Sequence, residues 1–168
     1  MAGGVEFKDF SIEVTEALDE TTIAWLLEAA NEITSQAQRT CQMEDDVGKR
    51  LKGSYKNAVD GRSGIAQIGT PLEEGYWEEW GTGEYAAHGD GRKGWWVYIR
   101  GQASQGGGKS YSTKEEADEA AAFLRRVKGL DAVVTNGRPP NYTLERAFEA
   151  KKGWAEDRLA DMLKERME

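Results

Sequence analysis

Apolar residues recur at intervals of three and four within residues 19–43, and this pattern is the strongest constraint on the fold. The residues that make it are Ile23, Leu26, Leu27, Ala30, Ile33, Ala37 and Cys41. Their spacing predicts a long amphipathic helix, with Asp19 or Thr21 as the cap at its start. The segment before it, residues 5–14, alternates only weakly and is compatible with either an arm or a short first helix, as part of an N-terminal stretch over 1–18.

The rest of the chain alternates between strand-like and helix-like segments. In order, we expect a helix over 46–58, a turn at Asp60-Gly61, a strand over 65–68, a helical turn over 72–80 and a strand over Trp95–Ile99. A helix follows from a Thr113 cap to a Gly129 stop, with Ala117, Ala121, Leu124 and Val127 along it. The chain then continues with a strand over 130–135 and a last helix through Leu144 and Leu163. Strands bracketed by helices predict an α+β fold. Its parts are a long N-terminal helix, a small, mostly antiparallel sheet with an inserted helix, and a C-terminal helix packed on the sheet.

Length and composition limit the class of protein. A chain of 168 residues fits one domain, 1–168, large enough to bury its own core. The single cysteine, Cys41, cannot form an internal disulfide, and with no secretory leader at the start we expect a reducing compartment. No run reaches the roughly 18 to 20 apolar residues of a membrane span. A net charge of −8 argues against a protein that binds the phosphate backbone of DNA.

Two glycine-rich stretches are similar to nucleotide-binding loops, but their surroundings argue against that role. Residues 103–110 spell AxxxxGKS, one letter away from a phosphate-binding loop. In such a loop the Lys-Ser pair begins a helix, whereas here the helix cap is Thr113. Residues 89–94 spell GxGxxG but lead into a strand. A nucleotide-dependent enzyme that uses Lys109 stays an alternative, which a titration with ATP and magnesium would detect.

Other catalytic sites lack parts. One histidine, His88, and one distant cysteine are too few for a zinc site or a Cys-His pair. The acids Glu73, Glu74, Glu78 and Glu79 include candidates for a glycosidase carboxylate pair, but acids clustered on one short helix are typical of a solvated face. We therefore expect no enzymatic activity, no cofactor, no metal and no small-molecule substrate.

The most specific segment is residues 75–86, which read GYWEEWGTGEYA. Here an aromatic and acidic helical turn runs into a Gly-Thr-Gly turn, an arrangement that the corner of a core would also explain. Gly81 and Gly83 permit a turn that side chains would block. Thr82 and Glu79 are placed to hydrogen-bond the exposed backbone of that turn.

The order of these residues resembles the tail-component family of long-tailed bacteriophages, the head–tail joining or tail-completion proteins. The family signature is an aromatic-x-Glu-aromatic-Gly-Thr-Gly core. The residues that we take as the shared core or interface are Trp77, Glu79, Trp80, Gly81, Thr82, Gly83, Tyr85 and Trp95. Residues 47–54 resemble the family's earlier helix end, and residues 135–144 resemble its Pro-rich entry to the last helix. The family usually lacks the loop, helix and strand that residues 101–134 insert here.

This resemblance implies a structural protein of the virion neck, assembled in the host bacterial cytoplasm. Such proteins act as homo-oligomeric rings, expected to hold six copies. They lie between head-closure or connector proteins and the tail-tube or tail-terminator proteins. DNA passes through the channel without specific binding, which suits an acidic chain. A ring needs two different faces on each copy, for which the aromatic corner and the terminal helices are candidates. An intracellular adaptor domain that forms no ring is the second alternative.

Overall fold

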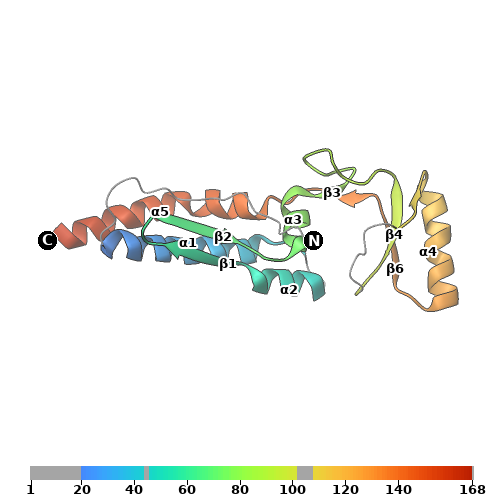
Figure 1. Ribbon diagram of the computed structural model, residues 1–168, viewed down its shortest axis with the longest axis horizontal. Coiled ribbons are helices and arrows are strands. Elements are labelled where there is room, and N and C mark those ends of the chain that lie inside the picture. The colour runs from blue at the N-terminus through green and yellow to red at the C-terminus, as the bar shows by residue number, and fades with distance from the viewer. Residues whose placement is uncertain (1–19, 44–45, 102–107, 168) are drawn as a thin grey trace. The chain divides into compact units, whose positions relative to one another are not determined.

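A computed structural model of the chain describes residues 20–43, 46–101 and 108–167 (Figure 1). In chain order the elements are α1 (Glu20–Thr40), α2 (Asp46–Ser54), β1 (Lys56–Asp60), β2 (Ile65–Gly69), α3 (Glu73–Trp80), β3 (Thr82–Gly83), β4 (Trp95–Ile99), β5 (Ser110–Tyr111), α4 (Lys114–Lys128), β6 (Ala132–Thr135), β7 (Gly137–Arg138) and α5 (Thr143–Met167). They form two compact units. The first holds the described residues up to Glu79 and from Tyr142 onward, and the second is Trp80–Asn141.

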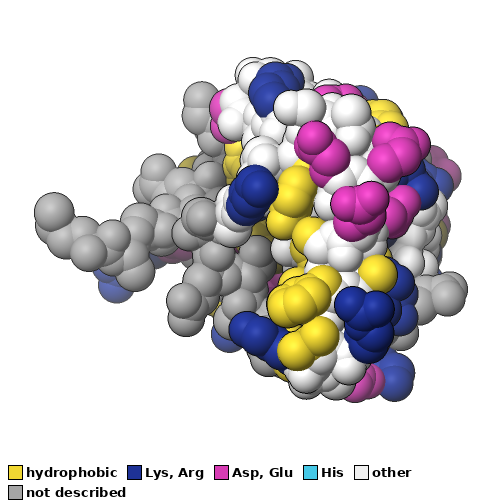
Figure 2. All heavy atoms as spheres, turned by 90° about the vertical axis from the view of Figure 1, so that its right-hand side faces the viewer, with side chains coloured by type: hydrophobic (Ala, Val, Ile, Leu, Met, Phe, Trp, Pro, Cys, Tyr) yellow, Lys and Arg dark blue, Asp and Glu magenta, His cyan; other side chains and the backbone are white. Residues whose placement is uncertain are grey.

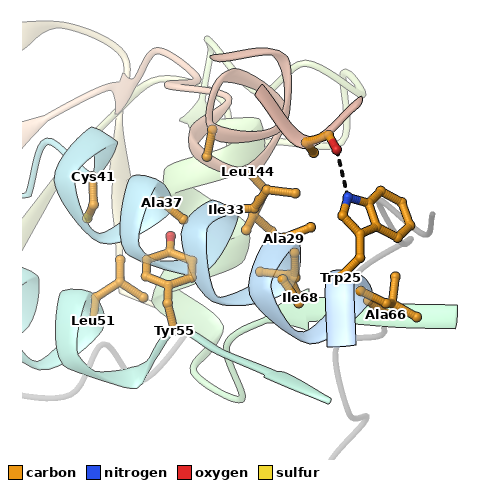
Figure 3. Close-up of a cluster of buried hydrophobic side chains, with 14 residues drawn as sticks. Trp25, Ala29, Ile33, Ala37, Cys41, Leu51, Tyr55, Ala66, Ile68 and Leu144 are labelled. Atoms are coloured by element: carbon orange, nitrogen blue, oxygen red, sulfur yellow. Dashed lines mark hydrogen bonds between the residues drawn. The ribbon is translucent and has the colours of Figure 1, made fainter. Parts of the chain in front are cut away.

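The first unit is built around α1, which packs against both α5 and the β1–β2 hairpin. The two helices run antiparallel. Near the start of α1 the Trp25 indole N–H donates to the Ala155 carbonyl at 2.6 Å, and farther along Glu32 pairs with Lys151 at 3.0 Å. Figure 3 shows the α1 side chains in the core that they share with α2, β2 and α5. The predicted N-terminal helix is thus confirmed as α1.

The buried face of α1 is wider than the predicted stripe. Trp25 and Ala29 are buried, although neither belongs to the apolar repeat, whereas Leu27 from that repeat is 45% exposed. A helix that is covered from two sides, by α5 and by the hairpin, buries a broader arc than a single stripe. The predicted cap Asp19 and the segment 5–14 lie outside the described residues.

The β1–β2 hairpin was predicted only in its second half. Its register runs antiparallel from Lys56↔Gly69 to Asp60↔Ile65. The strand predicted over 65–68 is confirmed, but the helix predicted over 46–58 is wrong beyond Ser54, where α2 ends. Tyr55 continues the helical spacing and is buried in the core just outside the helix. The Asp60 carboxylate closes the turn by accepting from the Arg62 backbone N–H at 2.9 Å.

The second unit contains an antiparallel sheet of order β5-β4-β6, on which α4 packs, and the short β3–β7 pair. The strand predicted over Trp95–Ile99 is confirmed as β4, and β6 lies within the strand predicted over 130–135. In the first unit α5 shares its core with the β2 residues Ala66 and Ile68. These arrangements confirm the α+β class, with an inserted helix and a C-terminal helix packed at a sheet. Folding of 1–168 as one domain stays a prediction.

The inserted helix α4 begins and ends as predicted. The Thr113 hydroxyl accepts from the Glu116 backbone N–H at 3.3 Å, and Gly129 stops the helix in the left-handed conformation, with φ of 62°. Ala117 and Ala121 are fully buried. Val127, which was expected along this helix, is 57% exposed. The stripe of α4 that packs is narrow because small residues form it, and Val127 lies outside that stripe.

Candidate functional site

The residues predicted as a shared core fall on both units of the chain. Trp77 and Glu79 belong to the first unit, and the chain passes into the second unit at Trp80. The members in the second unit are Trp80, Gly81, Thr82, Gly83, Tyr85 and Trp95. The two groups are therefore described separately.

Glu79 holds the start of α5 in place. Its side chain is 2% exposed, and its two carboxylate oxygens accept from the Leu144 N–H at 2.8 Å and the Glu145 N–H at 3.2 Å. The Glu79 main-chain carbonyl also accepts from the Tyr142 N–H at 3.2 Å. The first N–H groups of a helix have no partner within the helix, and a negative charge there also favours the helix dipole. Glu79 thus caps α5 from a distant part of the sequence. Its predicted role, a hydrogen bond to the backbone of its own Gly-Thr-Gly turn, is wrong.

Glu78 links the end of α1 to the same helix start. Its side chain is fully buried, and one carboxylate oxygen accepts from the Gln42 N–H at 2.7 Å and the Thr143 hydroxyl at 3.3 Å. The predicted solvated face is therefore wrong for Glu78 and Glu79, although Glu73 is exposed. Both buried acids have hydrogen-bond donors from segments far along the chain, which is how a carboxylate becomes tolerable in a core.

The surroundings of Glu79 favour the uncharged carboxyl. Burial raises the pKa of the Glu79 carboxyl, the N–H groups of Leu144 and Glu145 oppose this, and the nearby charges of Glu145 and Glu78 add to it. Burial is also the main cause that raises the pKa of the Tyr55 hydroxyl and of the Cys41 thiol. A thiol with a raised pKa is a poor nucleophile, so this cluster fits a structural role better than a reactive one.

The Gly-Thr-Gly segment forms a two-residue strand, β3, that pairs with β7. Thr82 lies opposite Arg138 and Gly83 opposite Gly137, and the Thr82 hydroxyl accepts from the Arg138 N–H at 3.1 Å. Gly81 has φ of +74°. A Cβ on Gly81 would lie 2.7 Å from the Arg138 carbonyl oxygen, and one on Gly83 would lie 2.1 Å from that of Asn136. The geometry agrees with the expectation that side chains would block this turn.

The aromatic residues of the set do not form one cluster. The Trp80 ring contacts the His88 ring, with centroids 4.7 Å apart, while Tyr85 is 49% exposed. Trp77 is half-buried on α3, and Trp95 is half-buried at the start of β4. The tryptophan that approaches the glycine turn is Trp96, whose ring would lie 2.6 Å from a Cβ on Gly83. The sequence pointed to the Trp-Trp strand but could not tell which tryptophan faces the turn.

The stretch similar to a phosphate-binding loop does not begin a helix. Residues 103–107 lie outside the described residues, Ser110 begins strand β5, and α4 begins only at Lys114 after the Thr113 cap. The Lys109 ammonium lies over the Tyr111 ring at 4.9 Å. Within residues 20–43, 46–101 and 108–167, no group of three or more His, Cys, Asp or Glu side chains is placed to hold a metal ion.

Comparisons of the chain with models of protein families, with curated proteins and with solved structures found no match. Among the helices that the structure describes, none has the length and apolar character needed to cross a membrane.

Proposed function

We propose that this chain is a non-enzymatic structural protein of the phage neck. It forms a homo-oligomeric ring, expected to hold six copies, that completes the tail and joins it to the DNA-filled head. Its partners are copies of itself, the head-closure or connector proteins and the tail-tube or tail-terminator proteins. DNA passes through the ring without specific binding, and the protein acts in the virion.

One observation supports this proposal most. Two of the segments that carry the resemblance, residues 77–85 and 135–144, are far apart in the sequence. In the second unit, Thr82 of the first segment binds Arg138 of the second, 56 residues later. In the first unit, Glu79 binds the N–H of Leu144, 65 residues later. Residues that belong to a family's fold signature are expected to make long-range contacts like these two hydrogen bonds, because such contacts hold distant parts of the chain together.

The insert is compatible with the same proposal. Residues 101–134 separate the two signature segments and supply β5, α4 and most of β6. The pairs that join the signature segments, β3 with β7 and Glu79 with the start of α5, use none of these inserted residues. An addition at this position therefore leaves the resemblance intact.

The surface offers candidate contacts for a ring, in which each copy presents two different faces. In the first unit, Leu27 on α1 is 45% exposed and Leu163 on α5 is 39% exposed. In the second unit, Tyr85 beside the Gly-Thr-Gly strand is 49% exposed. Tyrosine is a frequent anchor at protein interfaces, and exposed apolar side chains such as those of the two leucines supply area that a contact can bury.

The proposal is tested by complementation of phage assembly in a lysate. If the gene for this chain is deleted, we expect filled heads and tails that do not join, and we expect purified protein to restore infectious particles. Lys109→Ala should restore them as well as the unchanged protein, because the proposal needs no nucleotide. Gly81→Val should not restore them, because valine would collide with the Arg138 carbonyl.

Normal particles from the deletion strain would contradict the proposal. Full activity of Gly81→Val would contradict the role given to the turn. Loss of activity in Lys109→Ala alone would favour the nucleotide-dependent alternative.

A further inference from the structure

The side of α4 that faces away from the sheet carries an unusual arrangement of side chains. It consists of Glu115, Glu119, Ala122, Phe123 and Arg126, all exposed, and we call it the outward stripe. Phe123 is 51% exposed and its neighbour Val127 is 57% exposed, which makes them the two most exposed large hydrophobic residues of the described chain. Figure 2 shows hydrophobic side chains on this side of the molecule, with acidic ones gathered above them and basic ones below.

The charges of the stripe alone have a simple explanation. Acids in the first turns and bases in the last turns of a helix favour its dipole. This does not account for Phe123 and Val127, which lose the benefit of burial, about 1.5–3 kcal/mol for each fully buried side chain. Nor are the charges used locally. Lys114 pairs with Asp118 at 3.0 Å, but Glu119 and Arg126 form no ion pair with any residue that the structure describes.

We propose that the outward stripe binds the same stripe of a second copy of this chain, with the two α4 helices antiparallel. In that orientation Glu115 and Glu119 of each copy face Arg126 of the other, and the apolar middle of one stripe meets that of its partner. A parallel pair would place like charges together. One patch that is complementary to itself is the mark of a two-fold contact.

Charge favours a second copy over other occupants. A nucleic acid or an anionic membrane surface would meet the acids Glu115 and Glu119, which repel phosphate. A second stripe in the antiparallel orientation places its Arg126 at the acidic end of the first stripe and its Phe123 at the apolar centre, and the two acids of each stripe share one arginine of the other.

The size of the contact indicates that it is weak. A helix of 15 residues is about 22 Å long. One stripe on each of two such helices buries less than the roughly 1,200 Å² of a stable complex. The pair should therefore form at high protein concentration, or where an assembly already holds copies close together. A ring closes through head-to-tail contacts at other surfaces, so this inference does not depend on the proposed function.

The test is sedimentation velocity of the full chain over a concentration series that reaches hundreds of micromolar. We expect reversible pairing that weakens in high salt. Phe123→Ser, at an exposed position, should weaken the association at least about tenfold and leave the circular dichroism spectrum unchanged.

Charge variants then test whether the charges of the stripe contribute to the pairing. Arg126→Glu makes the stripe wholly acidic, and the double change Glu115→Arg with Glu119→Arg makes it wholly basic. Neither variant should associate with itself, whereas an equimolar mixture of the two should pair. Lys93→Glu is the control for Arg126→Glu, since it changes the net charge equally at an exposed position that does not belong to α4, and it should pair like the unchanged protein.

Several results would overturn the inference. One is a chain that stays monomeric throughout the series. Another is a Phe123→Ser variant that associates as before, and a third is a mixture of the acidic and basic variants that does not pair. If the protein also forms the proposed ring, pairing through α4 doubles the mass of the assembly, and these variants should halve it. A ring whose mass is the same in all variants would refute the α4 contact and leave the ring intact.

Discussion

Replacing Glu79 with alanine should destabilise the first unit by about 2–4 kcal/mol. The change removes the acceptor of the Leu144 and Glu145 N–H groups, and Leu144 is itself only 3% exposed. Each N–H group that loses its acceptor costs about 1–3 kcal/mol, or about 2–6 kcal/mol for the two groups together, and these lost bonds are the cap of the helix. Alanine also removes the cost of burying the Glu79 carboxyl, the same burial that raises its pKa. The expected loss of unfolding free energy therefore lies in the lower part of this range, at about 2–4 kcal/mol.

The assay is chemical denaturation followed by circular dichroism, with hydrogen exchange of the α1 amides to assign the change to the first unit. Glu73→Ala is the matched control, because Glu73 is an exposed acid on the same helix and its loss should cost no more than about 0.5 kcal/mol. Equal unfolding midpoints for Glu79→Ala and Glu73→Ala would refute the capping role of Glu79.

Further changes test other parts of the structure. Burial raises the pKa of Glu79 in the folded chain. The difference in unfolding free energy between the unchanged protein and Glu79→Gln should therefore favour the unchanged protein most below pH 4.5, the ordinary value of the Glu79 pKa, and decrease as the pH rises through the raised pKa. A difference that is constant from about pH 4 to 8 would contradict this. Gly81→Ala should cost more stability than Gly89→Ala. The two glycines have similar φ angles, +74° and +72°, but of the two only a Cβ on Gly81 meets another atom within 4 Å. Equal melting temperatures of the two variants would argue against the collision. Trp25→Phe should cost about 1–3 kcal/mol of unfolding free energy, because the hydrogen bond to the Ala155 carbonyl is lost. The control is Trp154→Phe at a half-buried position, and an equal loss in the two variants would show that this hydrogen bond contributes little.

The elements that the sequence predicted well are those whose signals are local. The repeat that predicts α1 extends over five turns, and the Thr113 cap and the Gly129 stop of α4 each depend on residues within one turn. The glycine turn was also predictable, because the spacing of Gly81 and Gly83 indicates a backbone that side chains would obstruct.

What the sequence did not reveal depends on distant contacts. β1 carries polar residues at most positions and exists because it pairs with β2. Burial of Glu78 and Glu79 depends on donors that lie 36 to 66 residues away, at Gln42 and at the start of α5. An acid-rich helical turn has no local feature that announces such partners, so composition suggested solvent instead. The exposure of Val127 was not predictable either, because apolar character alone does not indicate which side of α4 meets the sheet.

The central claim is that this chain forms the ring that joins tail to head. Its most direct test is electron microscopy, with immunogold labelling, of particles purified from cells that carry the gene. The account predicts label at the junction of head and tail, and a ring of several copies at that position. A protein that is monomeric in solution and absent from purified particles would contradict it.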